Sequence, residues 1–126
     1  MAYQLDFITN SLFGVATHDT DAQNWHFKFS DEISVSTSGF WRLLENKKIV
    51  LVSVDHGHQF GLSKPIDLSE EIRNRLLNKS LLKIRINEIT SDLALIFSDQ
   101  FEIEIFISSS GYESYDLLLN GKRYIG

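Results

Sequence analysis

Apolar and polar side chains alternate through most of this chain, and the alternation predicts a protein built mainly from strands. Trp25, Phe27 and Phe29 occupy every second position of the segment NWHFKF, which places them on one face of an extended strand. Short turns separate such segments, so we expect neighbouring strands to pair antiparallel. The same period of two recurs at Ile33 and Val35, at Leu82 to Ile86, at Leu93 to Phe97 and at Phe101 to Ile107.

A single segment near the middle of the chain has a helical period instead. Leu68, Ile72 and Leu76 recur at every fourth position of DLSEEIRNRLLNKS and form one narrow apolar stripe. The segment opens on an acid that is followed three residues later by Glu, which is typical of a helix start. The sequence therefore predicts a helix over residues 67–78. The expected fold class is α+β, with antiparallel β-meanders before and after this single central helix, which packs on the sheet.

Two stretches of the chain resemble one another. SDEISVSTSGFWRLLENKK matches SDQFEIEIFISSSGYESYDLLLNGK, because each reads Ser-Asp, an alternating strand, Ser-Gly, two aromatic residues, Leu-Leu and a turn with Asn. The matching regions are residues 29–50 and 97–125, with the predicted helix between them. One interpretation is an internal duplication with a few residues inserted in the second copy. The other is that meanders reuse the same residues, because Ser, Asp, Asn and Gly favour turns.

Size and composition favour one soluble domain, residues 1–126, and argue against several classes of protein. The net charge is −5 and Cys is absent. An acidic chain lacks the basic stripe that a nucleic-acid binder uses against phosphates, and a chain without Cys has no thiolate metal site. The longest apolar run, IVLVSV, is too short to span a bilayer, and the N-terminus lacks a signal-peptide pattern. We expect a cytoplasmic protein without nucleic-acid or membrane partners.

The segment DHGHQFG contains the most suggestive polar residues. His56 and His58 would project on the same side of an extended segment. A catalytic zinc site needs a third protein ligand, which His18 or Asp21 could supply only through the fold. The alternative is a plain polar loop before the helix, and we expect no metal or other cofactor. Because no Gly-x-Ser-x-Gly motif is present, no catalytic residues are predicted.

Acidic and aromatic residues of the chain are the candidates for contacts with a partner. Glu102 and Glu104 alternate with apolar residues and should point away from the core. With Glu113 and Asp116 they would form an acidic patch, unless that sheet face is simply solvated. Aromatic residues that follow the glycine bends are candidate anchors, because aromatics are favoured at interfaces. The predicted partner-binding residues are Glu102, Glu104, Glu113, Asp116, Phe40 and Tyr112, and the next candidates are Asp19, Asp21, Asp31 and Glu32.

Four motifs, DHGHQFGL, DLSEEIRNRLL, DLALIFSDQFEIEIF and SSSGYESYDLLL, resemble a family of small bacterial proteins of unknown function. Similar proteins occur among the immunity proteins of toxin systems, including contact-dependent growth inhibition. The resemblance covers the chain from about Trp41 to Gly126, and SSGYE after an alternating strand is its most specific part. It implies a non-catalytic protein that binds and neutralises a cognate toxin, and it assigns no catalytic residues.

Two functional hypotheses from different classes follow. The first is an immunity protein whose partner is a basic toxin domain, since opposite charges steer association. The second is a small enzyme or ligand-binding domain that uses His56 and His58 in a cleft. A convex acidic face would favour the first hypothesis, whereas a deep pocket that converges on the histidines would favour the second.

Overall fold

The computed structural model describes residues 4–126, which form an antiparallel sheet of ten strands with one α-helix and two short 3-10 helices. The predicted α+β class is confirmed at this level. The strands are β1 (Gln4–Asp19), β2 (Asn24–Phe29), β3 (Ile33–Thr37), β4 (Trp41–Glu45), β5 (Lys48–Val52), β6 (Ser80–Asn87), β7 (Leu93–Phe97), β8 (Phe101–Ile105), β9 (Tyr115–Leu119) and β10 (Lys122–Ile125). The helices are α1 (Leu68–Leu76), η1 (Ser53–Asp55) and η2 (Ser98–Gln100).

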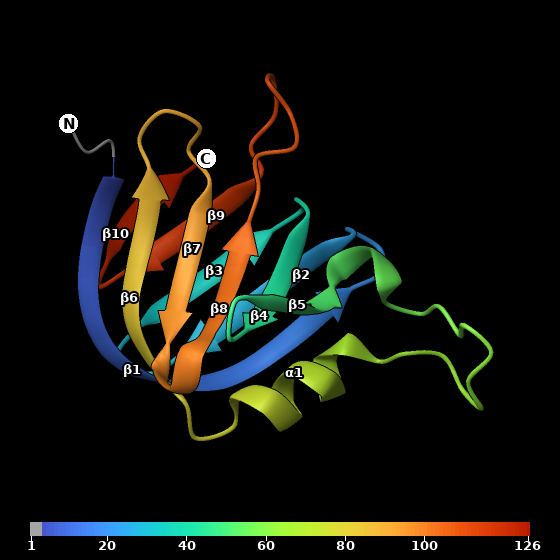
Figure 1. Ribbon diagram of the computed structural model, residues 1–126. Helices are drawn as coiled ribbons and strands as arrows, with labels where there is room; N and C mark the ends of the chain where they lie inside the picture. The colour runs from blue at the N-terminus through green and yellow to red at the C-terminus, as the bar shows by residue number, and fades with distance from the viewer. Residues whose placement is uncertain (1–3) are drawn as a thin grey trace.

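The long strand β1 belongs to both layers of a bent sheet (Figure 1). Its first half pairs with β6 and its second half pairs with β2, where the register shifts between Phe13 and Val15. Gly14 lies at this shift, and a Cβ there would come within 2.9 Å of the carbonyl oxygen of Lys28. A residue without a side chain is therefore needed where β1 passes from one layer to the other. The strand order is β10-β9-β3-β2-β1-β6-β7-β8-β4-β5.

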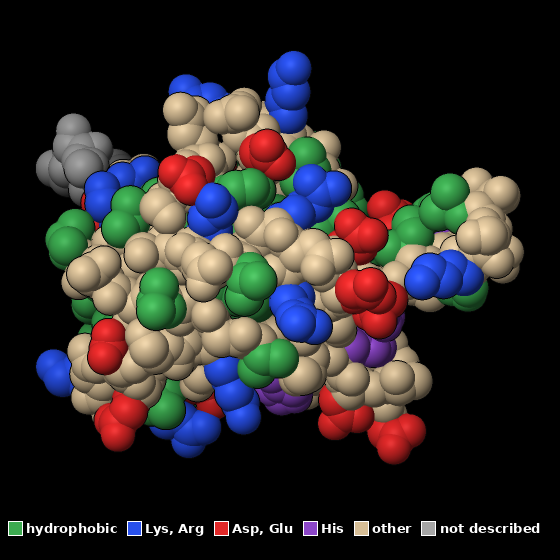
Figure 2. Space-filling model, turned by 90° about the horizontal axis from the view of Figure 1, so that it is seen from below, with side chains coloured by type: hydrophobic (Ala, Val, Ile, Leu, Met, Phe, Trp, Pro, Cys, Tyr) green, Lys and Arg blue, Asp and Glu red, His purple; other side chains and the backbone are tan. Residues whose placement is uncertain are grey.

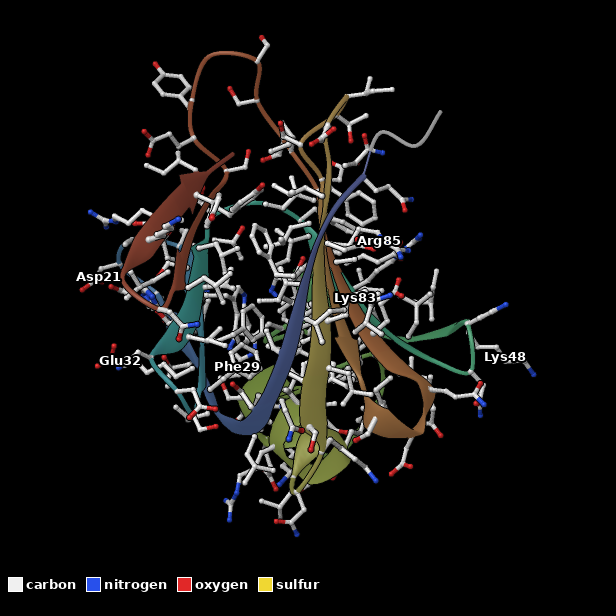
Figure 3. The ribbon with its side chains drawn as sticks, turned by 90° about the vertical axis from the view of Figure 1, so that its left-hand side faces the viewer. Asp21, Phe29, Glu32, Lys48, Lys83 and Arg85 are labelled. Carbon is white, nitrogen blue, oxygen red and sulfur yellow. The ribbon has the colours of Figure 1, made fainter. Side chains whose placement is uncertain are left out.

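The core lies between the two layers, where the apolar faces of the strands meet (Figure 3). Phe29 lies in this space, whereas Lys83 and Arg85 project from the outer side of one layer. Trp41 and Ile103 are fully buried. Along β3, β7, β8 and β9, buried positions alternate with more exposed ones, as the period of two predicts.

Helix α1 covers the lower end of the space between the layers and contacts β1 (Figure 1). The predicted stripe is confirmed, because Leu68, Ile72 and Leu76 are all buried. Asp67 is the N-cap, and its carboxylate accepts hydrogen bonds from two backbone N–H groups of the first turn. The helix is therefore slightly shorter than the predicted 67–78, since Asp67 caps it from outside.

The prediction of one meander on either side of the helix is met only in part. β1, β2 and β3 form one meander, and β6, β7 and β8 form another. The hairpin that follows each meander pairs with the other half of the chain, because β4 lies beside β8 and β9 lies beside β3. Gly39 lies where the first half crosses over, and a Cβ there would be 2.7 Å from the carbonyl oxygen of Phe106. This close passage explains the glycine.

The strand plan is the same in both halves of the chain. If each strand of β1–β5 is exchanged with its counterpart in β6–β10, the strand order stays the same when it is read from the opposite edge of the sheet. A local hydrogen bond repeats as well. The hydroxyl of Ser30 accepts from the N–H of Leu12 at 2.9 Å, and the hydroxyl of Ser98 accepts from the N–H of Ser80 at 3.0 Å.

The two crossing segments are also bonded to each other symmetrically. The N–H of Ser38 donates to the carbonyl oxygen of Ser114 at 3.1 Å. The N–H of Phe106 donates to the carbonyl oxygen of Phe40 at 2.9 Å. The matching sequence stretches thus occupy equivalent turns and crossings, whatever their origin.

Candidate functional site

Two histidines and a tryptophan come together beside the start of α1. His18 lies near the end of β1, His56 follows η1, and their ring centroids are 4.9 Å apart. The ring of Trp25 in β2 lies 4.8 Å from that of His18 and 5.0 Å from that of His56. These residues border a depression of about 360 Å³, which we call the histidine pocket. Its lining includes His18, Trp25, Ser38, Phe40, His56 and Ser108.

The side chain of His56 is fixed by the backbone of α1. The N–H of Leu68 donates to Nδ1 of His56 at 3.1 Å, so the neutral ring carries its proton on Nε2. Burial lowers the pKa of His56 and the nearby His18 lowers it further, whereas Asp67 raises it. The arrangement therefore favours an uncharged imidazole in the pocket at neutral pH.

The chain between η1 and α1 forms a loop that projects from the molecule (Figure 1). We call residues 57–66 the projecting loop. Its base is closed by a hydrogen bond of 2.8 Å from the N–H of Ile66 to the carbonyl oxygen of His58. Phe60 is 64% exposed and Leu62 is 53% exposed. Two large apolar side chains are thus presented to solvent on a loop with a defined base.

Several carboxylates are near the histidine pocket, but none belongs to the described residues that line it. Asp19 and Asp55 are each next in sequence to a pocket histidine, and Asp21 is exposed in the turn after β1. Asp67 is close enough to act on the charge of His56. None of the described residues that line the pocket is Lys or Arg. Figure 2 shows acidic and histidine side chains together at the base of the projecting loop, with Lys and Arg side chains beside them.

His56 and His58, which the sequence analysis pairs, have different surroundings. His56 packs against His18, whereas the ring of His58 stacks on Phe60 with centroids 5.4 Å apart. Gly57 between them has φ +83, and this turn breaks the extended conformation that would align the two imidazoles. Among the described residues, no group of three or more His, Asp or Glu side chains is placed to hold a metal ion.

Glu102 and Glu104 lie on the outer face of the layer that contains β8, as their alternation predicts. Nε of Arg42 is 2.7 Å from Oε1 of Glu104. Burial raises the pKa of Glu102, and Glu104 raises it further. Arg85 and Arg42 act on it in the opposite direction, and Lys83 projects from the same face (Figure 3). This face therefore has charges of both signs.

Glu113 and Asp116 lie on the other side of the molecule. Asp116 belongs to β9, which pairs with β3 and β10 in the second layer, and it forms an ion pair with Arg123 at 2.5 Å. Glu113 and Asp116 line one shallow depression. The four predicted acids therefore do not lie on one surface, because the chain crosses between the layers after β8.

The two predicted aromatic anchors lie in different parts of the molecule. Phe40 is 36% exposed at the edge of the histidine pocket, and its ring centroid is 5.7 Å from that of Phe106. Tyr112 is 85% exposed in the loop between β8 and β9 and does not line the pocket. Of the predicted partner-binding residues, Phe40 is the one that the fold brings to the pocket.

Sequence reasoning did not identify the exposed apolar residues beside the pocket. Val54, Phe60 and Leu62 are exposed, although their residue types are usual for a core. Phe60 and Leu62 lie in a segment with Gly57, Gly61 and Ser63, where neither the strand period nor the helix period applies, whereas Val54 ends the apolar run IVLVSV. Large apolar residues in such a segment are candidates for exposure.

Comparison with known proteins gives no relative from which a function can be taken. No protein-family model matches the chain, and no curated protein or solved structure matches it. Within the part of the chain that the structure describes, no helix has the length and apolar character to cross a membrane. The functional argument therefore depends on the geometry and the charge of the candidate site.

Proposed function

We propose that the protein is a non-catalytic binding module of the immunity-protein kind, which neutralises a cognate bacterial toxin by masking it. The observation that carries the proposal is the projecting loop, whose large apolar side chains are exposed. The docking surface consists of this loop, Val54 of η1 and the rim of the histidine pocket. The resemblance in sequence motifs to immunity proteins points in the same direction.

The projecting loop has the properties of a preorganised contact. Burial of the Phe60 side chain against a partner would contribute about 1.5–3 kcal/mol. Nε2 of Gln59 donates to the carbonyl oxygen of Leu62 at 2.6 Å, which adds to the hydrogen bond at the base. Because these bonds already restrict the loop, less conformational entropy would be lost on binding.

The charge of this end of the molecule favours a basic partner. The chain has a net charge of −5, and Asp19 and Asp55 are sequence neighbours of the two pocket histidines. Opposite charges accelerate association and select against acidic partners. A toxin domain that acts on an anionic substrate, such as a nuclease, has the complementary charge.

A second candidate function is a ligand-binding or catalytic domain, which one observation favours. The uncharged His56 lies against His18 in the pocket, and a neutral imidazole is a suitable general base. In this case a small molecule would occupy the pocket, and His58 would have no part in it. His18→Ala would then abolish activity, whereas changes in the projecting loop would leave it unchanged.

The proposal is tested with the toxin domain encoded beside this protein in its genome. Association and dissociation rates are measured for the wild type and for Phe60→Ser/Leu62→Ser. The control is Ile8→Ser, because Ile8 is 78% exposed on β1 and lies outside the proposed surface. The double variant should dissociate at least about tenfold faster, and the control should match the wild type.

Two outcomes would overturn the proposal at different levels. Equal dissociation rates for the wild type and the double variant would remove the projecting loop from the interface. Failure of the wild type to bind the toxin domain, together with failure to protect cells that express it, would remove the immunity function.

A further inference from the structure

The histidine pocket is a place where the two halves of the chain differ. In the pairing of β1 with β2, His18 faces Trp25, and at the equivalent place in the pairing of β6 with β7, Ile86 faces Leu93. Two apolar side chains in one half thus correspond to two polar aromatic side chains in the other. The difference lies at one defined position of a strand plan that is otherwise shared.

At the end of the second half, Tyr115 contacts other residues of its own half. The hydroxyl of Tyr115, at the start of β9, donates to the carbonyl oxygen of Ser91 at 2.9 Å. Gly126 packs so closely on the ring of Tyr115 that a Cβ on it would clash. The equivalent of Tyr115 in the first half is Trp41, but there the pocket of about 360 Å³ is open. Tyr115 also borders a depression of about 230 Å³, so both ends are hollowed and the larger hollow lies in the first half.

Aromatic rings contribute to the histidine pocket, where Trp25 is only 4% exposed and Phe40 is the accessible ring. Trp25 is fixed by a perpendicular contact with Trp41, with ring centroids 5.1 Å apart. Phe40 stands at the rim, supported by Phe106. Planar cations stack on such rings, and a guanidinium does so better than an ammonium because it is flat and weakly hydrated.

The polar groups of the pocket suit a cation that donates hydrogen bonds. Ser38 and Ser108 line it and have hydroxyl oxygens that can accept. The uncharged ring of His56 does not repel a positive charge. The carboxylate of Asp67 is close enough to act on the charge of His56 and would attract one. A guanidinium has five N–H donors and no acceptor, so its donors match these oxygens.

We propose that the histidine pocket receives the guanidinium group of an arginine side chain. That the arginine belongs to a toxin domain rests on the proposed function. The preference of the pocket for a guanidinium group rests only on the ring of Phe40, the hydroxyls of the lining and the nearby carboxylate of Asp67.

The test is a titration of the whole protein with N-acetyl-arginine amide, followed by NMR. Saturable shifts are expected for the ring protons of His18, His56 and Trp25. N-acetyl-citrulline amide, which has nearly the same shape without the charge, should give no saturable shift. Phe40→Ala should weaken binding of the arginine amide about three- to tenfold. Tyr112→Ala removes an exposed aromatic outside the pocket and should leave the binding unchanged.

Several results would contradict the assignment. They are equal shifts with citrulline amide, unchanged affinity in Phe40→Ala, or shifts centred on Glu102 and Glu104 instead of the pocket. If Phe40→Ala fails to fold, Ser108→Leu replaces it, since a larger side chain at this exposed position of the lining should block the pocket. Binding of the arginine amide that persists in Ser108→Leu would equally overturn the inference.

The failure of this inference and the failure of the proposed function are distinguishable. If the arginine amide binds but Phe60→Ser/Leu62→Ser leaves toxin binding intact, the pocket assignment stands and the docking surface is wrong. If the loop variant loses toxin binding but the arginine amide does not bind, the docking surface stands and the pocket assignment is wrong.

Discussion

The first half of the chain, β1–β5, and the second half, β6–β10, share one strand plan but end differently. The turns after β2 and β7 both place two consecutive residues at positive φ, Asp31 and Glu32 in the first and Asp99 and Gln100 in the second. Both turns are preceded by a serine whose hydroxyl accepts a backbone hydrogen bond. These shared features belong to the fold, because both halves need them to form the same sheet.

The ends of the two halves differ in their residues. His18 and Trp25 border an open pocket in the first half, whereas in the second half Tyr115 packs against Gly126 and donates a hydrogen bond to Ser91. Where equivalent positions of the two halves carry different residues, the shared strand plan does not explain the difference. The comparison therefore separates residues that specify the sheet from residues that are free to serve binding.

Removal of a core side chain should have the largest effect on stability and should differ between the halves. Ile103 of β8 and its counterpart Val35 of β3 are both fully buried. Ile103→Ala should lower the free energy of unfolding by about 2–5 kcal/mol, and Val35→Ala should lower it less because a smaller side chain is removed. Denaturant unfolding measures both. A loss below about 0.5 kcal/mol for Ile103→Ala would place that position outside the core.

Acidification should weaken the protein through His56, which has no histidine counterpart in the second half. The pKa of His56 in the folded state lies below the ordinary value of 6.5. Below that pH the unfolded state binds more protons, so the stability is complete above about pH 6.5 and falls as the pH drops toward the folded pKa. The slope for one such group is at most about 1.4 kcal/mol per pH unit.

Unfolding measured between about pH 7.5 and pH 5.5 tests this expectation. His56→Asn should flatten the pH dependence, because the group that titrates is removed. The control is His58→Asn, which changes a histidine of the exposed projecting loop and should keep the wild-type slope. An unchanged slope in His56→Asn would show that another group causes the acid sensitivity.

The shared serine turns should give similar, smaller losses. Ser30→Ala and Ser98→Ala each remove a hydroxyl that accepts a backbone N–H, so each should cost about 1 kcal/mol of unfolding free energy. The loss should be somewhat larger for Ser98→Ala, because its hydrogen bond is less exposed to water. Denaturant midpoints of the two variants provide the measurement. A clear loss of unfolding free energy in one variant and none in the other would show that the two serine turns are not equivalent.

Charge reversal should have the smallest effect on stability and should decide which face meets the toxin. Asp21→Lys changes an exposed side chain, so stability should move by less than about 0.5 kcal/mol, while association with a basic toxin domain slows at low salt. Glu102→Lys/Glu104→Lys should leave the association rate near that of the wild type. Stopped-flow kinetics at low and high salt compare the two. A larger effect of the double reversal would move the interface to the outer face of β8.

Much of the fold follows from local periodicity in the sequence. The period of two locates Trp25, Phe27 and Phe29 on the inner face of β2, and the stripe from Leu68 to Leu76 locates α1. These predictions succeed because the side-chain spacing of strands and helices is set by backbone geometry alone. The turn residues succeed for the same reason, since positive φ is a local property.

Local periodicity does not predict which strands pair or where the pocket forms. Sequence reasoning expects β4 to follow β3 in one meander, but the chain crosses at Gly39 and pairs β4 with β8, a contact that no local pattern encodes. His18 meets His56 only because β1 bends through both layers. Glu104 and Asp116 come apart because the chain crosses again after β8. Each of these features depends on contacts between segments that are far apart in the sequence.

The exchange of hairpins between the halves has a consequence for synthesis on the ribosome. The pairing edge of β3 is available early, but its partner β9 comprises residues Tyr115–Leu119, far downstream in the sequence. Likewise, the edge of β4 stays unpaired until β8 has been synthesised. An unpaired edge is open to other chains during this interval, and pairings between distant segments form slowly. The nascent chain therefore completes neither layer until both β8 and β9 have been synthesised, so these edges stay unpaired for longer than in a chain of consecutive hairpins.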